Sequence, residues 1–390
     1  MRFVGLCCGI FLALALPASP SGQAVGPQPT KVASASNVPV HTKKKVAKEA
    51  TSPPAKELFS AVKTPAAEAA RSIGFYARGC LAGAKSLPID GAAWQAMRLS
   101  RNRNWGHPNL VALIEKLAVE ARAHDGWPGL LIGDISQPRG GPMPSGHASH
   151  QVGLDVDIWL TPMPEERLSA LQREELSATS MLADDKVSID PHVWTDAHLR
   201  VLKRAASYPI VERIFVHPAI KKALCEAAAR DSDRSWLHKV RAYWGHNDHF
   251  HLRIACPAGS PCRSQRPLSS DDGCGKELTR WLALVAPKPL APKPAKPARP
   301  QPPKPETALD QLPAECRAVL TKAPGGVAIP VAAKPTGAPD RLPRRSLLPR
   351  RRRRSGRRRS KGTNDYAEPE VTQSAPANLP VDLILSPLAP

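Results

Sequence analysis

Apolar and polar residues alternate along two stretches of the chain. From Val152 to Leu160 every second residue is apolar, and residues 250, 252 and 254 repeat the pattern farther on. A period of two predicts a strand with one buried face, so the polar residues between share the other face. On the first strand these are Gly153, Asp155 and Asp157, and on the second they are His249, His251 and Arg253.

Longer apolar periods predict helices around these strands. Pro108 opens an amphipathic pattern that predicts a helix over residues 108–121. Helices are also expected over 165–176, 195–207, 218–229 and 234–243, and strands over 130–135 and 211–216. The predicted class is α+β, with a small, mainly antiparallel sheet that carries the metal ligands, helices at its flanks, and disordered N- and C-terminal extensions.

The composition changes along the chain and predicts four segments. Residues 1–24 carry an early Arg2, a short apolar run and small residues, which predict a secretory signal peptide and export; the alternative is an N-terminal anchor. Residues 25–71 are poor in aromatic residues and predict a disordered linker. All eight Trp fall within 72–283, the expected catalytic domain, and 284–390 is expected to be a Pro/Lys-rich and Arg-rich disordered tail. No transmembrane segment is expected after signal removal.

The tail carries much of the charge. After Ala286 there are 20 Lys and Arg against 8 Asp and Glu, or +12 of the chain's +21. In an exported protein this predicts attraction to anionic polymers or lipid head groups. Nucleic acid is not an expected partner, because the signal peptide argues against it and no aromatic residue interrupts the Arg-rich run at 344–359.

Imidazoles and carboxylates gather in and just before the two strands. Together they are the ligand set of a catalytic zinc, which keeps one position open for water. A single His or Asp is more often a structural hydrogen-bonding residue, but this concentration on two polar faces favours a metal site. One Zn²⁺ per chain is expected.

Two runs resemble the signature segments of the penicillin-insensitive murein endopeptidases. They are residues 147–157, HASHQVGLDVD, and residues 246–253, HNDHFHLR. The similarity extends from about Ser72 to Cys274 and includes residues 106–108, 131–134, 213–216 and 272–275. This group of metallopeptidases also contains lysostaphin-type enzymes, D-Ala-D-Ala peptidases and Hedgehog-like domains.

The resemblance implies a function and a compartment. It implies an exported zinc endopeptidase that cleaves the D-alanyl to meso-diaminopimelyl cross-link of bacterial peptidoglycan in the periplasm. Such an enzyme needs no Ser or Cys nucleophile and is therefore insensitive to β-lactams, which acylate a serine.

The resemblance also implies roles for individual residues. His150, Asp157 and His251 are the implied metal ligands, and His147 is a fourth ligand or a partner of one. His249 is the expected general base and His246 the transition-state stabiliser or proton donor, with the swapped assignment left open. Asp155 is expected to orient an imidazole or to serve as a structural hydrogen-bond acceptor.

One departure from the family concerns a second ion. Members can carry an Asp-x-x-His that binds a further metal, whereas residues 184–188 here supply Asp185 and a second carboxylate but no His in register. A second ion is therefore doubtful. His41, His107, His124, His217 and His238 are expected to be structural or exposed.

Six cysteines follow the predicted signal peptide, an even number that predicts disulfides in an exported chain. The resemblance implies the pairs Cys225–Cys274, Cys256–Cys262 and Cys80–Cys316, the last of which would staple the tail to the domain.

Two other functions fit the same pattern. One is a D,D- or L,D-carboxypeptidase or dipeptidase of the same metal group, which would trim stem peptides instead of cross-links. The other is a non-catalytic wall-binding protein that keeps a structural zinc.

Overall fold

A six-stranded mixed sheet forms the centre of the fold in the computed structural model, which describes residues 53–287 and 306–325. Its strands, in spatial order, are β4 (Trp94–Ala96), β6 (Leu130–Ile132), β7 (Asp155–Trp159), β10 (His249–Ile254), β8 (Val211–Val216) and β9 (Val240–Ala242). The inner pairs are antiparallel, and the outer pairs, β4 with β6 and β8 with β9, are parallel. The fold is α+β, as predicted.

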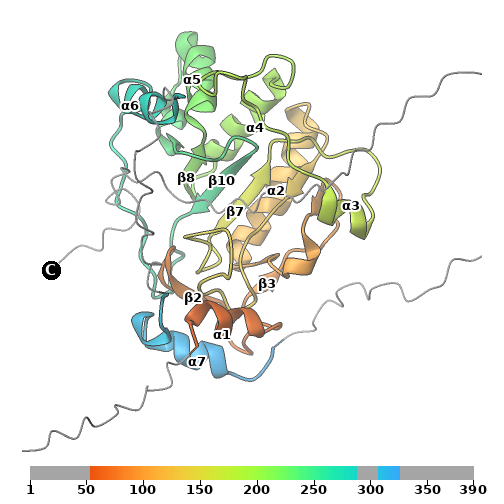
Figure 1. Cartoon of the computed structure of the whole chain (residues 1–390), viewed down its shortest axis with the longest axis vertical. Helices are drawn as coiled ribbons and strands as arrows, with labels where there is room; N and C mark the ends of the chain where they lie inside the picture. Colours follow the sequence, from red (N-terminus) through yellow and green to blue (C-terminus); the bar gives the residue numbers. More distant parts are fainter. Residues whose placement is uncertain (1–52, 288–305, 326–390) are drawn as a thin grey trace, which may run out of the picture. The chain divides into compact units, whose positions relative to one another are not determined.

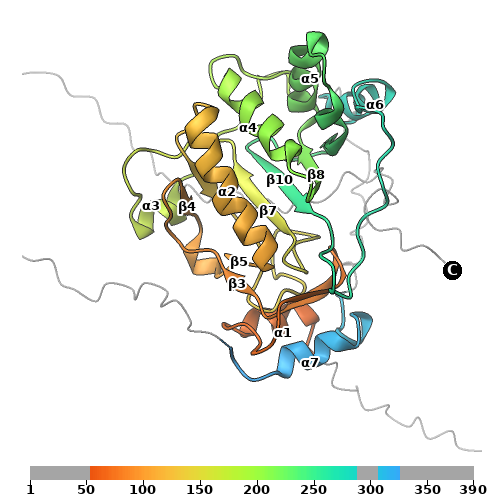
Figure 2. The same cartoon turned by 180° about the vertical axis from the view of Figure 1, so that it is seen from behind.

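Helices cover the apolar face of this sheet. Viewed from behind, α2 (Pro108–His124) and α4 (Asp196–Ser207) cross in front of β7, β10 and β8 (Figure 2). Their buried side chains join those of the strands in one core, in which Leu117, Trp127 and Phe250 are almost fully buried. Alternating residues of β7 and β10 thus face this core, and the polar residues between them face the other way.

Two helices begin with the same His-Pro dipeptide. His107 precedes α2 and His217 precedes α5 (Pro218–Ala227), and each imidazole Nδ1 accepts a hydrogen bond from the backbone N–H two residues on, at 3.2 Å. Proline at the first helical position lacks the N–H that would be unpaired there. Burial lowers the pKa of His217 to about 4, so its lone pair stays available for the cap.

Some predicted elements are shorter or different. The first motif strand begins at Asp155, because Gly153 adopts a left-handed φ of 68°. A Cβ there would lie 2.4 Å from Leu81. The helix expected over 165–176 is only α3 (Ala170–Glu175), which starts at a capping box on Ser169.

The prediction of a helix over 234–243 is wrong. The structure has a 3-10 helix, η3 (Ser235–Lys239), followed by β9, whose residues pair with β8. The local apolar spacing does not reveal this strand, because the pairing depends on a partner more than 20 residues away.

The expected linker and tail are ordered where the structure describes them. Helix α1 (Ala55–Ala61), the turn η4 (Leu309–Gln311) and helix α7 (Glu315–Thr321) pack with the hairpin of β1 (Arg71–Phe75) and β2 (Arg78–Ala82). Figure 1 shows α7 beside β2 and α1, although it is far away in sequence. Phe59 and Cys316 are fully buried there, so the prediction of disorder for residues 53–71 and 306–325 is wrong. The expected signal peptide and the Arg-rich run lie outside the described residues.

Arg139 joins this small cluster to the loop before the first motif. Its guanidinium donates to the carbonyls of Val319, Leu320 and Lys322, at the C-terminal end of α7, and to that of Thr64. These carbonyls have no partner within their own helix, and a cation also suits the negative end of the helix dipole.

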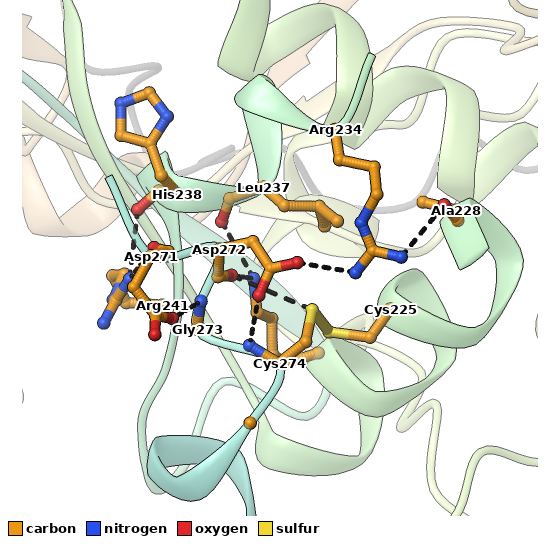
Figure 3. Close-up of a disulfide and its surroundings, with 12 residues drawn as sticks. Cys225, Ala228, Arg234, Leu237, His238, Arg241, Asp271, Asp272, Gly273 and Cys274 are labelled. Atoms are coloured by element: carbon orange, nitrogen blue, oxygen red, sulfur yellow. Dashed lines mark hydrogen bonds and ion pairs between the residues drawn. A yellow bond between two sulfur atoms is a disulfide. The ribbon is translucent and has the colours of Figure 1, made fainter. Parts of the chain in front are cut away.

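Three disulfides form in the pairing that the family resemblance implies: Cys80–Cys316, Cys225–Cys274 and Cys256–Cys262. The first two join residues 236 and 49 positions apart, and the third closes a local loop of residues six positions apart. Around Cys225–Cys274, the loop that carries Asp272 is held by cations (Figure 3). Arg234 donates to the Asp272 carboxylate, and the buried Lys221 ammonium donates to the Asp272 carbonyl. The Cys225–Cys274 disulfide tethers α5 to the start of α6 (Lys276–Val285).

No helix among residues 53–287 and 306–325 is long and apolar enough to cross a membrane. The short pair β3 (Lys85–Ser86) with β5 (Trp105–Gly106) and the 3-10 turns η1 (Leu99–Arg101) and η2 (Ala228–Arg230) complete the elements.

Candidate metal centre

The pairing of β7 with β10 places carboxylates opposite imidazoles. His251 lies across from Asp157, and Arg253 lies across from Asp155. All four residues are buried on the polar face of the sheet. Because both strands alternate with the same period, one register brings the two sequence motifs together.

The loop between β6 and β7 supplies two further histidines. His150 has a left-handed backbone, with φ 66°. Its backbone N–H donates to Asp155 Oδ2 at 3.1 Å, and its ring Nδ1 lies 2.7 Å from the carbonyl oxygen of Ile135. His147 precedes it, with Nε2 3.0 Å from Asp134 Oδ2. Asp134 lies two residues after β6, so the segment that leaves that strand positions His147.

Three imidazoles converge on the Asp157 carboxylate. Oδ1 lies 3.3 Å from His150 Nε2 and 3.3 Å from His251 Nδ1, and Oδ2 lies 3.5 Å from His147 Nδ1. His147, His150 and Asp157 offer ligand atoms within 4.8 Å of one another, which makes them a possible metal site. Asp157 itself is 5% exposed.

Each imidazole directs one ring nitrogen toward Asp157. The opposite ring nitrogen of each one faces an acceptor: the Ile135 carbonyl for His150, Asp134 for His147, and Asp155 for His251, at 2.9 Å. If the ring binds a metal through the nitrogen nearer Asp157, that nitrogen must be bare and the nitrogen at the second acceptor carries the proton. Partners of this kind fix the tautomer of metal-binding histidines.

The donor set fits a divalent cation. His150 Nε2 and Asp157 Oδ1 are buried and have no hydrogen-bond partner among the described residues, and unpaired buried polar atoms are rare. Ligand atoms of a tetrahedral zinc with bonds of about 2.0–2.1 Å lie about 3.3 Å apart, close to the distances found here. Burial would raise the pKa of the Asp157 carboxyl, but His150, His147 and His249 hold it well below its ordinary value, so the carboxylate is charged.

Two more histidines, both half-buried, lie next to the centre. His249 Nδ1 lies 2.6 Å from Asp248 Oδ1, and its Nε2 lies 3.8 Å from Asp157 Oδ1. Burial lowers the pKa of His249, but Asp157 and Asp248 outweigh this and raise it overall. His246, with φ 54°, gives its Nδ1–H to the Trp244 carbonyl at 3.0 Å; burial and the neighbouring His249 lower its pKa well below the ordinary value.

Buried arginines balance the carboxylates. Arg253 donates from Nε to Asp155 Oδ1 at 2.6 Å, and Arg103 donates to Asp134 Oδ2 at 2.7 Å. Burial would raise the pKa of both carboxyls, but these guanidiniums and the nearby imidazoles hold each below its ordinary value. Both carboxylates therefore remain charged and can accept from the histidines that they orient.

The predicted site residues fall into two groups. The structure gathers His147, His150, Asp155, Asp157, His246, His249 and His251 around one point. Asp185 is exposed and accepts from the backbone N–H groups of Val187 and Ser188 in its own turn. Among the described residues it belongs to no metal-capable group. The roles of individual residues stay predictions.

Sequence reasoning did not single out three residues that contact the site. Asp134 and Asp248 each hold a histidine, and Arg103 neutralises Asp134. Asp134 lies inside the strand predicted over 130–135, whereas in the structure β6 ends at Ile132 and Asp134 lies two residues beyond it. Asp248 lies inside the second motif itself.

A model of the penicillin-insensitive murein endopeptidase family matches residues 72–321. Curated proteins with that name are similar to the chain. The protein of Haemophilus influenzae is 44% identical over 227 residues, which cover 58% of this chain and 78% of the relative. That of Pectobacterium atrosepticum is 40% identical over 269 residues, covering 69% and 90%, and that of Yersinia pestis bv. Antiqua is 43% identical over 258 residues, covering 66% and 87%.

Proposed function

The chain belongs to the penicillin-insensitive murein endopeptidase family of peptidases, and from this premise we propose that it is an exported zinc endopeptidase of bacterial peptidoglycan. The bond that we propose it cleaves is the D-alanyl to meso-diaminopimelyl cross-link, in the periplasm. The observation that carries the proposal is the convergence of three imidazole nitrogens on the buried Asp157 carboxylate, where His150 Nε2 and Asp157 Oδ1 have no hydrogen-bond partner among the described residues. The N-terminal pattern supports export, and the basic tail supports attraction to anionic polymers or lipid head groups.

We propose that His150, Asp157 and His251 hold the ion, with His147 beside them as a fourth ligand or a hydrogen-bonding partner. Zinc held by such groups makes a hydroxide nucleophile available at neutral pH and polarises the carbonyl to be attacked. Asp155 and the Ile135 carbonyl fix the tautomers of His251 and His150 for this task.

His249 is the proposed general base. Its Nδ1–H is held by Asp248, which leaves Nε2 directed toward Asp157 and the metal side of the centre. A carboxylate in this position keeps the imidazole in one tautomer and stabilises the cation that forms when Nε2 takes a proton. His249 can then return this proton to the leaving amine.

His246 has a different environment. It has no carboxylate partner among the described residues, and its Nδ1–H is used by the Trp244 carbonyl. Its Nε2 is therefore an acceptor. In place of the transition-state stabiliser or proton donor that the resemblance implies, we propose that this nitrogen accepts a hydrogen bond from the N–H of the scissile amide.

The experiment is digestion of purified cross-linked dimeric muropeptides, with the products separated by chromatography and identified by mass spectrometry. The wild-type protein is expected to convert dimers into monomers, to stop when a chelator removes the metal, and to recover when zinc is added back. His249→Ala is expected to lose at least about a hundredfold in kcat, the lower end of the usual contribution of a general base. His124→Ala, an exposed histidine in the last turn of α2, serves as the matched control.

Other outcomes separate the alternatives. Loss of a terminal D-Ala alone would indicate a carboxypeptidase. Binding to murein without soluble products, in the wild type and His249→Ala alike, would indicate a wall-binding protein. Undiminished cleavage by metal-free protein would refute the metal mechanism.

A further inference from the structure

The 3-10 turn η1 lies between two residues with left-handed backbones. Arg98 has φ 54° and Asn102 has φ 53°, and neither is glycine. Of the five non-glycine residues with positive φ in the described chain, His150 and His246 lie in the candidate metal centre itself. Such conformations persist only where surrounding contacts enforce them, and they cluster at functional sites.

The contacts that enforce this turn come from both sides. Glu174 of α3 accepts from the backbone N–H and the hydroxyl of Ser100, at 2.7 and 2.9 Å. Asn102 donates to the Lys63 carbonyl at 3.2 Å and accepts from the Trp105 indole at 2.8 Å. The turn is therefore fixed, and with it the backbone of Arg101.

Arg101 is the exposed guanidinium of the centre. Three arginines contact the carboxylates that hold the histidines, and their side chains differ in exposure: 47% for Arg101, 7% for Arg103 and 2% for Arg253. Arg103 donates to both Asp134 and Ser145, and Arg253 donates to Asp155 and Gln265. Of these three arginines, Arg101 is thus the one whose side chain remains largely accessible.

Asp134 does not need Arg101 for neutralisation. Its Oδ2 already accepts from Arg103 at 2.7 Å and contacts His147 Nε2 at 3.0 Å, and the contact with Arg101 is the longest, at 3.3 Å. One carboxylate thus faces two guanidiniums, and the positive charge of Arg101 is not needed to balance Asp134. This charge suits an anionic group of a bound substrate.

We propose that Arg101 binds a carboxylate of the substrate next to the scissile bond. The inference rests on the proposed function. In a D-alanyl to meso-diaminopimelyl cross-link, the nitrogen of the scissile amide is attached to a carbon that bears a free carboxylate. A substrate whose amide reaches the metal centre carries this carboxylate only a few atoms away, where the Arg101 guanidinium can pair with both of its oxygens. Arg101 is then a specificity-determining residue.

The test compares two dimers that differ in this one group, a free carboxylate or its primary amide. The wild type is expected to cleave the acid with a kcat/KM about 10- to 100-fold above that of the amide, the usual range for a charge-assisted hydrogen bond. Arg101→Gln is expected to lose this preference through a higher KM for the acid, while its rate on the amide changes less than about threefold. Arg101→Lys should recover part of the preference, since lysine restores the positive charge but not the planar guanidinium that can donate to both carboxylate oxygens.

The matched control is Arg167→Gln. Arg167 is similarly exposed, at 51%, and pairs with Asp90 away from the centre, so both rates should stay at the wild-type values. A binding readout accompanies the kinetics: the inactive His249→Ala protein should bind the acid dimer more tightly than the amide dimer, and the double variant with Arg101→Gln should not.

Two results overturn the proposal. One is equal cleavage of acid and amide by the wild type, which leaves the endopeptidase function intact. The other is an equal loss on both substrates in Arg101→Gln, which would make Arg101 structural. If the wild type cuts neither dimer, the proposed function fails and the subsite fails with it.

Discussion

Replacing Asp155 by Asn tests whether one buried carboxylate holds the metal centre together. Asp155 is fully buried and accepts from three donors: His251 Nε2, Arg253 Nε and the backbone N–H of His150. An asparagine has the same shape but brings an NH₂ group in place of one oxygen. Every neighbour is itself a donor, so this NH₂ must face a donor, and Arg253 loses its counter-charge.

The magnitude follows from these contacts. Arg253 is 2% exposed, and removing the partner of a buried ion costs about 3–5 kcal/mol. Loss of the group that orients a metal-binding histidine weakens metal binding about 10- to 100-fold. Asp155→Asn is thus expected to lower the free energy of unfolding of the metal-free protein by about 3–5 kcal/mol and, separately, to weaken zinc binding by one to two orders of magnitude.

The stability difference should depend on pH. The pKa of Asp155 is held below its ordinary value of 3.8, against burial, by Arg253 and His251. The stabilisation by the charged carboxylate is therefore fully present above about pH 4 and is lost as the pH falls through the folded-state pKa. The gap between wild type and Asp155→Asn should narrow in acid.

Urea denaturation of metal-free protein measures the first quantity, and competition with a chromophoric chelator measures the second. Asp185→Asn is the control, because Asp185 also accepts several hydrogen bonds but lies exposed in its own turn. In the double variant Asp155→Asn/Arg253→Met, stability should recover in part while zinc binding stays weak. A free energy of unfolding of Asp155→Asn within about 1 kcal/mol of the wild-type value, or an unchanged zinc affinity, would refute the reasoning.

Three further predictions concern the scaffold. Burial lowers the pKa of Lys221 from 10.5 to about 7. Between pH 7 and 10.5 the unfolded chain therefore binds more protons at Lys221 than the folded chain, and the free energy of unfolding should rise with pH, by at most about 1.4 kcal/mol per pH unit. In Lys221→Met the urea midpoint should not show this rise. Trp281→Ala removes a buried ring that packs 5.2 Å from Tyr243 and should cost about 3–5 kcal/mol in urea denaturation; a loss below about 1 kcal/mol would contradict this. Cys80→Ser with Cys316→Ser should cost about 2–5 kcal/mol and speed amide exchange in α7, whereas unchanged exchange would show that packing alone holds that helix.

The two motif strands could be predicted because their information is local. Alternation assigns Asp157 and His251 to polar faces without any knowledge of the partner strand. That the two faces become one site depends on the antiparallel register of β7 and β10, which brings these residues opposite each other. The resemblance implied that Asp157 and His251 are ligands of one metal, but the register itself is seen only in the structure.

Elements that depend on distant partners could not be predicted in the same way. Helix α1 has only seven residues and little apolar surface, yet Phe59 is fully buried against a cluster that includes α7, more than 250 residues later. Composition predicted disorder because it counts apolar residues within a segment. It does not count those that a remote segment contributes.

The histidines and the carboxylates near them also differ in how far local sequence explains their roles. His107 and His217 looked like isolated residues, and the Pro that follows each one is the local clue to a helix cap. Asp248 and Asp134 were harder to assign, since a carboxylate that orients a ring is defined by a contact and not by a spacing.

The Cys80–Cys316 bond has a consequence for how the chain responds to proteases. It joins β2 to α7 across a sequence separation of 236 residues, so residues 288–305 lie inside a covalently closed ring. A single cut in that stretch, which is rich in Pro and Lys, yields two polypeptides that stay one molecule until reductant is added. The cationic segment after residue 325 therefore remains attached to the enzyme after such a cut, and gels run with and without thiol would reveal it.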